Sequence, residues 1–377
     1  MNKKEVSEIR RQYVPDRCTI SRICGCYVDA EKNIKTTLKE AFLSLPEDDA
    51  FKYFTIFKKT LSGSIGKNLI NLDFPLEEEK EGGCQEFLLK LRDSKLKDDS
   101  LTQQFYNKII ETFDYGENYY IILIHSAYDV PGKASDGTEM YDASDTVFDY
   151  ILCSICPVHL SKPSLGYNEE KNRIENRIQD WIVEPPVKGF LFPSFNERFT
   201  DIHSMLYYTK NTAELQEGFL KQMFGCQHIP LDADTQKETF NGLITDTLGE
   251  ECDYNLVKNI HEILNEKLEE FKDSPEPLEL GKQEMRRLFE ESGVSDEQLE
   301  SFEQNYDQLA GEQTSFLASN IASTKTFHIE TPDVVIKVNP ESASLVETRI
   351  IDGRQCLVIA VNEHVEVNGI NIRIPNE

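Results

Sequence analysis

The sequence has few basic residues relative to its acidic ones. Lys and Arg together number 40, against 67 Asp and Glu, so the formal net charge at pH 7 is −27. A surface of this charge repels phosphate backbones and anionic lipid. We therefore do not expect nucleic acid or a membrane to be the main partner of this protein.

Long hydrophobic runs are also missing. The apolar stretches, such as YYIILI at 119–124, are far shorter than the roughly 20 residues that cross a bilayer. The segment MNKKEVSEIRRQY carries charges every few positions and lacks the apolar centre of a secretory signal. We expect a cytoplasmic protein with no membrane span, in which the nine cysteines are reduced thiols.

Complete catalytic and metal-binding motifs are missing as well. The sequence contains neither a G-x-S-x-G nucleophile turn nor an H-E-x-x-H zinc helix. A single C-x-x-C pair, Cys153 and Cys156, has no second pair downstream. On a strand, two residues an odd number apart point to opposite faces, so these two sulfurs cannot share a metal. We predict buried structural cysteines here, and neither a metal nor a cofactor.

An acidic stretch at 129–149 is the remaining candidate for metal binding. Its spacing does not follow the calcium-loop pattern, in which ligands alternate at every second position. We interpret it as a loop whose acids form turns and caps, with a divalent metal as the minor alternative. The acids concerned, within 136–145, are Asp136, Glu139, Asp142 and Asp145.

The patterns that are present predict an α+β fold. Residues 1–230 are expected to form a domain with a mixed central sheet flanked by helices. The helices are predicted near 46–63, 84–95 and 101–114, and the buried strands at 119–124, 147–158, 187–195 and 203–208. One helix should bury a single apolar face made of Phe51, Phe54, Phe57 and Leu61.

The rest of the chain changes character twice. Residues 231–312 show helical patterns alone and are strongly acidic, with a capping-box signature at Ser295 and Gln298. Residues 325–377 contain short strand patterns and the two-residue turn signals Asp352-Gly353 and Asn368-Gly369. We predict an acidic helical segment followed by a small β module.

Seven polar residues follow the predicted buried strands. If the strands are neighbours and end at one edge of the sheet, these side chains could converge in a polar pocket. Each histidine among them also has a simpler interpretation as a hydrogen-bonded residue at the sheet edge. The candidates are His125, His159, Lys162, Asn196, Arg198, Asp201 and His203.

Three strings in the sequence resemble a known family. They are ILCSICPVHLSKPSLGY, GFLFPSFNERFTDIHSMLYYTKN, and the ending VIKVNP, LVETRIIDGR and VEVNGINI. They are similar to domain-of-unknown-function family 4317 of clostridial-type Gram-positive bacteria, over almost the whole chain. The resemblance implies a bacterial, cytoplasmic setting and assigns no catalytic residue.

Three functions of different classes fit these observations. The first is a non-enzymatic protein-binding or regulatory protein with an unidentified protein partner, because no catalytic motif is complete. The second is a hydrolase or other small-molecule enzyme in which Asp201 orients a histidine that acts as general base. The third is association with RNA or the ribosome through the arginine-rich N-terminus, which contains Arg10, Arg11, Arg17 and Arg22.

Overall fold

The computed structural model contains two compact units, Met1–Ala233 and Asp234–Glu377. It describes residues 1–133, 139–140, 146–227, 229–249, 252–312, 314–324, 326–361, 365–367 and 370–372. Helices and strands alternate irregularly along the chain, and the predicted α+β class is confirmed. None of the helices in these ranges has the length and apolar composition of a bilayer span.

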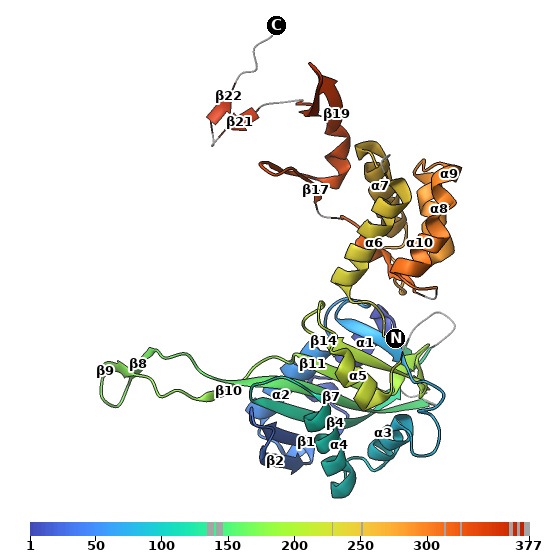
Figure 1. The fold of residues 1–377 in the computed structure, drawn as a ribbon. Coiled ribbons are helices and arrows are strands. Elements are labelled where there is room, and N and C mark those ends of the chain that lie inside the picture. The colour runs from blue at the N-terminus through green and yellow to red at the C-terminus, as the bar shows by residue number, and fades with distance from the viewer. Residues whose placement is uncertain are drawn as a thin grey trace. The chain divides into compact units, whose positions relative to one another are not determined.

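The first unit is built on an eight-stranded sheet in the order β2-β1-β4-β7-β11-β14-β3, with β10 paired to β7 (Figure 1). Every pairing in this sheet is antiparallel, so the prediction of a mixed sheet is wrong. Strands β4, β7, β11 and β14 follow one another along the chain, and the described residues between them form ribbons and loops without the helices that connect parallel strands. The strands are β1 (Ile20–Val28), β2 (Ile34–Glu40), β3 (Leu69–Asp73), β4 (Tyr119–Val130), β7 (Thr146–Leu160), β10 (Trp181–Val183), β11 (Lys188–Phe192) and β14 (Ser204–Thr209).

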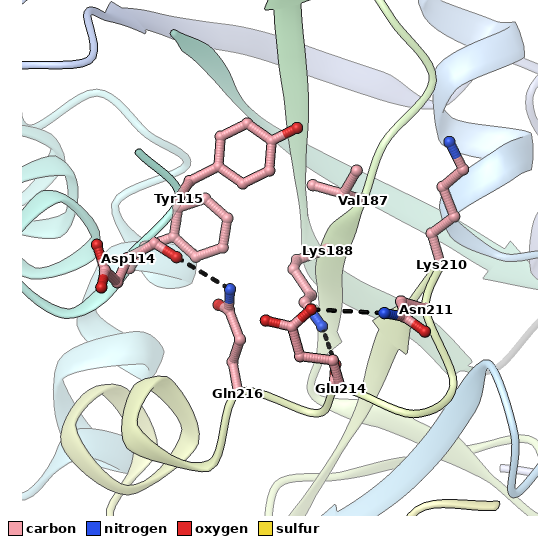
Figure 2. Close-up of a pocket in the computed structure, with 9 residues that line it drawn as sticks. Asp114, Tyr115, Val187, Lys188, Lys210, Asn211, Glu214 and Gln216 are labelled. Atoms are coloured by element: carbon pink, nitrogen blue, oxygen red, sulfur yellow. Dashed lines mark hydrogen bonds between the residues drawn. The ribbon is translucent and has the colours of Figure 1, made fainter. Parts of the chain in front are cut away.

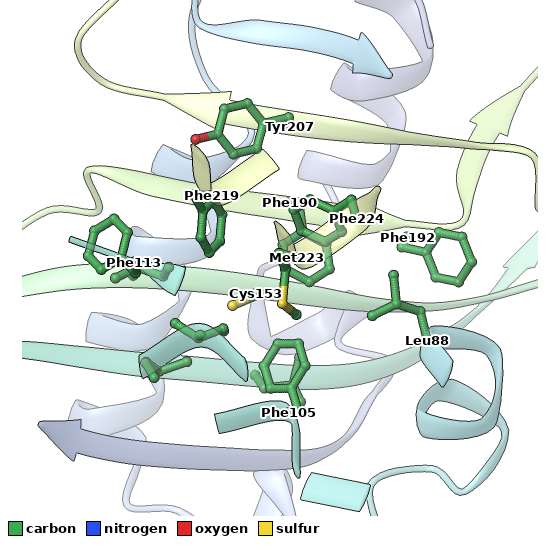
Figure 3. Packing of buried hydrophobic residues seen from close by; sticks show 14 of the residues in the cluster. Leu88, Phe105, Phe113, Cys153, Phe190, Phe192, Tyr207, Phe219, Met223 and Phe224 are labelled. Carbon is green, nitrogen blue, oxygen red and sulfur yellow. The ribbon is translucent and has the colours of Figure 1, made fainter. Parts of the chain in front are cut away.

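Helices cover both faces of this sheet. Because strand side chains alternate between faces, each face supplies its own hydrophobic core. One core packs against α1 (Lys3–Arg10) and α2 (Glu47–Thr60). The other packs against α3 (Cys84–Asp93), α4 (Asp99–Thr112) and α5 (Glu217–Phe224), and aromatic rings from both the sheet and the helices fill it (Figure 3). Short elements complete the unit: η1 (Pro15–Arg17), η2 (Phe42–Ser44), β5 (Gly132–Lys133), β6 (Glu139–Met140), β8 (Leu165–Asn168), β9 (Arg173–Asn176), β12 (Ser194–Asn196) and β13 (Phe199–Asp201).

The apolar face predicted for α2 is confirmed in part. Phe54, Phe57 and Leu61 are buried, whereas Phe51 is 46% exposed. Each step of three residues falls about 60° short of a full helical turn, so a run of such steps drifts away from the face on which it began. The strand predicted over 187–195 likewise ends early, at Phe192, because the following proline cannot donate to the ladder.

The two cysteines of the C-x-x-C pair confirm the prediction made from strand geometry. Cys153 lies in the core beneath α3, α4 and α5, and Cys156 lies in the core on the α1 and α2 face. Burial raises the pKa of both thiols. The two sulfurs therefore serve as apolar packing groups in different layers of the protein.

The second unit has its own helical core. Its buried side chains include Phe240, Leu264, Phe289 and Tyr306. The predicted capping box is confirmed, because Ser295 and Gln298 cap each other's backbone at the start of α9. The elements of this part are α6 (Ala233–Leu248), α7 (Tyr254–Glu270), β15 (Glu279–Leu280), α8 (Lys282–Glu291), α9 (Asp296–Leu299), α10 (Phe302–Leu309), β16 (Phe316–Leu317) and α11 (Ala318–Ile321).

In the described ranges, three pairs of antiparallel strands follow these helices. Positive φ at Asp352 (50°) and Gly353 (74°) confirms the two-residue turn between β19 and β20, whereas the predicted Asn368-Gly369 turn lies outside the described residues. Phe327 packs its ring 5.9 Å from His261 of α7. The prediction that 231–312 and 325–377 are separate parts thus stays open. The elements are β17 (Phe327–Glu330), β18 (Val335–Val338), η5 (Pro340–Leu345), β19 (Val346–Ile351), β20 (Arg354–Ile359), β21 (Val365–Val367) and β22 (Ile370–Ile372).

Candidate functional site

The seven candidate side chains do not share one pocket. Antiparallel neighbours run in opposite directions, so consecutive strands finish at opposite ends of the sheet. His125 pairs with Ile151 of β7, and His159 lies further along the same strand, about 26 Å away at the usual rise per strand residue. His159 and Lys162 are therefore far from His125.

Asp201 gathers its hydrogen bonds from its own neighbourhood. Asn196 Nδ2 and Ser204 Oγ both donate to its Oδ2 at 2.6 Å, and the backbone N–H of His203 donates to its Oδ1 at 3.0 Å. Burial raises the pKa of Asp201, but these donors outweigh it and lower the pKa. The His203 ring instead contacts Glu79, at 2.8 Å. Asp201 thus closes the β12–β13 hairpin, and no histidine ring lies among its hydrogen-bond partners in the described part of the chain.

Arg198 links the same hairpin to the N-terminal helix. Its Nη2 donates to Glu8 Oε1 and to the carbonyl oxygen of Pro131, each at 3.0 Å. Tyr128 also donates to Glu8, at 2.9 Å. These bonds tie three segments together at the end of the sheet, so this arginine has a structural role.

His125 has partners that the sequence did not single out for it. Its Nδ1 lies 2.6 Å from Ser21 Oγ, and its Nε2 lies 2.6 Å from Asp149 Oδ1. Partial burial raises the pKa of Asp149, but the contact with His125 and the charges of Arg92 and Lys95 outweigh it and lower the pKa. The Nε2–Oδ1 contact is close, but its geometry is not that of a hydrogen bond, and in the Ser21–His125 hydrogen bond the tautomer of the ring decides which atom donates.

This Ser-His-Asp group spans three neighbouring strands. Ser21 lies at an irregularity of β1, between Ile20 and Arg22, and is exposed, whereas the His125 side chain is buried. The strand pairing brings together residues that are 104 positions apart in the chain. No motif within a single segment could have indicated this contact.

A long two-stranded ribbon is the most unusual surface feature of the first unit. We call residues 160–183 the arm. It continues β7 and β10 outward and ends in the hairpin of β8 and β9, well away from the sheet (Figure 1). Between its base and its tip, backbone hydrogen bonds join the two sides of the arm. The Ser161 N–H donates to the Asp180 carbonyl oxygen at 2.8 Å, and the Arg177 N–H donates to the Ser164 carbonyl oxygen at 2.9 Å.

The arm exposes many large apolar side chains. Ile178 is 82% exposed and Leu165 is 74% exposed, and the chain's single tryptophan, Trp181, is 58% exposed. The complete set of exposed large hydrophobic residues in the arm is Leu160, Leu165, Tyr167, Ile174, Ile178, Trp181, Ile182 and Val183. Isolated exposed apolar residues are normal on protein surfaces, but a continuous set is typical of an interaction site.

Three of these apolar residues, Leu165, Tyr167 and Ile174, share one face of the arm tip. Tyr167 pairs with Ile174 and Leu165 pairs with Asn176, and side chains of paired residues and of every second residue share a face. The opposite face is polar, since Glu175 accepts from Asn168 at 2.6 Å, from Lys171 at 3.0 Å and from Arg173 at 2.8 Å. The tip is therefore an amphipathic hairpin with no helix over its apolar face among the described residues.

The arm also differs from the rest of the chain in charge. Between 161 and 183 the bases balance the acids, four to four, in a chain whose net charge is −27. Lys162 belongs to the arm, and His159 lies at its base, where it pairs with Ile182 of β10. Two features of the sequence could have indicated the arm: the apolar residues at alternating positions in 165–167 and 174–178, and the single tryptophan.

The remaining sequence hypotheses concern metal and RNA. In the part of the chain that the structure describes, no group of three His, Cys, Asp or Glu side chains could hold a metal ion, so the expected absence of metal stays a prediction. The metal alternative for the acidic loop falls mostly on residues 134–138 and 141–145, outside the described ranges. Arg10, Arg11 and Arg17 are exposed near α1, where they could meet an anionic partner.

Comparison with known proteins gives a family and no function. The family model of the Domain of unknown function (DUF4317) matches residues 1–370. No curated protein matches the chain significantly. The match covers both units, and it leaves the bacterial origin implied by the resemblance untested.

Proposed function

Because the chain belongs to the DUF4317 family, whose function is unknown, we propose a function from its geometry: it is a protein-binding protein that docks its partner on the arm. The observation that carries this proposal is the continuous apolar face of the arm tip, formed by Leu165, Tyr167 and Ile174. A two-stranded hairpin alone is only marginally stable in water. A partner that covers this face stabilises the hairpin as well as the complex.

The energetics favour burial of this face. Moving one large aliphatic or aromatic side chain from water into an apolar contact is worth roughly 1.5–3 kcal/mol. Tyrosine and tryptophan, both present in the arm, are enriched at the central contacts of protein interfaces. The free edges of the ribbon also offer backbone groups for strand addition.

The charges indicate what kind of protein fits. The arm is balanced in charge, so its apolar face meets a partner without charge repulsion, whereas the chain as a whole carries −27. A partner with an apolar groove set in a basic surface satisfies both conditions. A second copy of this chain is disfavoured because its net charge has the same sign.

The first experiment identifies the partner by position. A photo-crosslinking amino acid is placed at Leu165 in the arm and, as a control, at Leu76 outside it, because the two leucines are 74% and 75% exposed. In cells of the source organism we expect one basic protein to crosslink from position 165 and not from position 76. Crosslinking to RNA alone, to a second copy, or equally from both positions would contradict the proposal.

The second experiment uses the purified partner. Trp181 is the only tryptophan and lies in the arm, so its emission reports directly on contact. We expect a blue shift on addition of the partner, and at least tenfold weaker binding for Leu165→Glu. Leu76→Glu should bind like the wild-type protein. Equal binding by the two variants would place the contact elsewhere.

A second candidate function rests on the Ser21, His125 and Asp149 group. The histidine can accept the serine proton while the carboxylate stabilises the imidazolium, which is the chemistry of a serine hydrolase. With a fluorophosphonate probe, Ser21 Oγ would form the bond to phosphorus, fluoride would leave, and His125 would take the proton. Mass spectrometry should find the label on Ser21 in the wild-type protein and not in His125→Ala; an unlabelled Ser21 in the folded protein would end this idea.

The remaining expectations keep their status as predictions. Cytoplasmic location follows from the sequence arguments and is checked by fractionation of the source cells. Nucleic acid stays an unexpected partner. RNA binding that is strong at low salt and weakens when Arg10, Arg11 and Arg17 are replaced by Glu would revive that hypothesis.

A further inference from the structure

A pocket of about 430 Å³ lies at one end of the first unit's sheet, and His125 lies toward the other end. It is bounded by the end of α4, the start of β11, the end of β14 and the loop that enters α5 (Figure 2). This pocket shares no residue with the arm or with the Ser-His-Asp group. Its volume lies in the range of small-molecule sites.

Lys188, at the start of β11, is the unusual group in this pocket. Its side chain is 4% exposed, and its Nζ donates to Thr209 Oγ1 at 2.8 Å and to the carbonyl oxygen of Glu214. No carboxylate forms an ion pair with it in the described part of the chain. A buried ammonium without a counter-ion is energetically costly. Burial accordingly lowers the pKa of Lys188 to about 8, and the charge of Glu214, which raises the pKa, does not offset the burial.

A second lysine lines the same pocket. Lys210 is exposed and forms no ion pair among the described residues. Acids outnumber bases by 67 to 40 in this chain, yet neither lysine at this pocket has a carboxylate partner among the described residues. Asp114 and Glu214 also border the pocket, but Glu214 Oε2 accepts from Asn211 at 3.5 Å and forms an ion pair with neither lysine.

Gln216 supplies an unused acceptor. It adopts the left-handed conformation, with φ 55° and ψ 62°, which is strained for a residue other than glycine. Its Nε2 donates to the carbonyl oxygen of Asp114 at 3.2 Å, while its buried Oε1 has no hydrogen-bond partner within the described ranges. Buried acceptors without partners are rare, and at a pocket they indicate a missing donor.

The wall opposite the lysines is aromatic. The rings of Phe113 and Tyr115 lie 5.6 Å apart and 11° from parallel, and both residues line the pocket. Figure 2 shows Tyr115 on the side of Asp114 and Gln216, with Lys188 and Lys210 across from them. The pocket thus offers positive charge on one side and a flat apolar surface on the other.

We propose that this pocket binds a small organic anion with a planar body. Its carboxylate or phosphate lies between Lys188 and Lys210, its planar part lies against Tyr115, and a donor on it reaches Gln216 Oε1. The ligand provides the counter-ion that Lys188 lacks and the donor that Gln216 lacks. The simpler role of Lys188, a tie that holds the loop before α5 through the carbonyl of Glu214, predicts no anion binding.

Calorimetry on the full chain with four probes tests the proposal. The probes are 4-aminobenzoate, benzoate, phenyl phosphate and inorganic phosphate. We expect 4-aminobenzoate or phenyl phosphate to bind with millimolar or better affinity and inorganic phosphate to bind at least tenfold more weakly than phenyl phosphate, because it has no planar part. The comparison of benzoate with phenyl phosphate shows which anionic group is preferred. Absence of binding by all four probes would overturn the proposal.

Variants decide which residues hold the anion. Lys188→Met should weaken binding at least tenfold and Lys210→Met about threefold. Lys221→Met, which removes an exposed lysine paired with Glu217 on α5, should bind like the wild-type protein. Lys210→Met alone is informative if Lys188→Met fails to fold, since an exposed side chain can be changed without loss of the core. Unchanged affinity in Lys210→Met and in a folded Lys188→Met would overturn the proposal.

The pH dependence gives an independent check. Lys188 holds its proton below about pH 8, so affinity should fall as the pH rises through that value. The other ionisable groups around it are Asp114, Glu214, Lys210, Tyr115 and Tyr207, and burial raises the pKa of both tyrosines. Affinity that stays constant from pH 7 to pH 9.5 would show that the Lys188 ammonium does not hold the ligand.

Discussion

Strand β7 belongs to two regions that share the same extended backbone but differ in what covers their side chains. From Ile151 to Ile155 it is buried between β4 and β11, with helices over both faces, whereas from Val158 to Leu160 it pairs with β10 and leads into the exposed arm. Apolar residues continue in both regions. The hydrogen-bonded ladder is therefore not what buries a strand. The layers that cover its faces do so, and the arm lacks such layers in the described part of the chain.

The same contrast predicts that the sheet contributes mainly to stability and the arm mainly to partner binding. Side chains in the sheet are packed on all sides, so their removal leaves a cavity. Side chains in the arm have water as their neighbour, so their removal leaves the folded state nearly unchanged. Substitutions of matched type in the two regions are therefore expected to have different consequences.

The largest expected effect is on the core. Phe190→Ala in β11 removes a ring that is packed against Phe105 and Phe224, and should lower the free energy of unfolding by about 3–5 kcal/mol. Ile174→Ala in the arm should change it by less than about 0.5 kcal/mol. Urea unfolding of the two variants measures both values, and a loss above about 2 kcal/mol for Ile174→Ala would mean that the arm is packed.

A pH-dependent effect should come next. The pKa of Lys188 is lowered from 10.5 in the unfolded chain to about 8 in the folded one, so between these values the unfolded state binds more protons. The free energy of unfolding of the wild-type protein, taken relative to that of Lys188→Met, should therefore rise by about 2–3 kcal/mol from pH 8 to pH 10.5. Unfolding of both proteins at pH 7.5 and pH 10 measures the difference, and an unchanged difference would show that the amine is solvated.

Two glycines sharpen the comparison at a smaller scale. A Cβ at Gly189 would lie 2.5 Å from the Cys153 carbonyl oxygen and 2.6 Å from Thr60 Cγ2, whereas the nearest atom to a Cβ at Gly166 is 3.6 Å away. Gly189→Ala should cost about 1–3 kcal/mol because the crowded core cannot yield, and Gly166→Ala in the arm should be nearly neutral. Melting temperatures of the two variants give the order, and a reversed order would contradict the assignment of core and arm.

The smallest expected effect is on stability when the arm itself is removed. Joining Leu160 to Trp181 by an Asn-Gly turn deletes the tip and keeps the pairing of β7 with β10. The melting temperature should change by no more than about 2 °C, because no core residue lies in the deleted segment. Binding of the crosslinked partner should be lost in the same variant.

The sequence by itself determined the α+β class, the positions of α2, α3 and α4, the buried strands β4, β7, β11 and β14, and the acidic charge. These properties depend on local periodicity and composition, which each segment carries alone. The opposite orientation of Cys153 and Cys156 also followed from local geometry, because the two residues are on one strand. The capping box at Ser295 was predictable for the same reason.

Only the tertiary structure decided the rest. Strand order and direction set which ends meet, and the antiparallel pairing separated His159 from His125 while it brought Ser21 and Asp149 to His125. The pocket around Lys188 combines four segments, so no single segment indicates it. The exposure of the arm likewise depends on layers that other parts of the chain do not provide, because the apolar pattern of a strand is the same whether a helix covers it or water does.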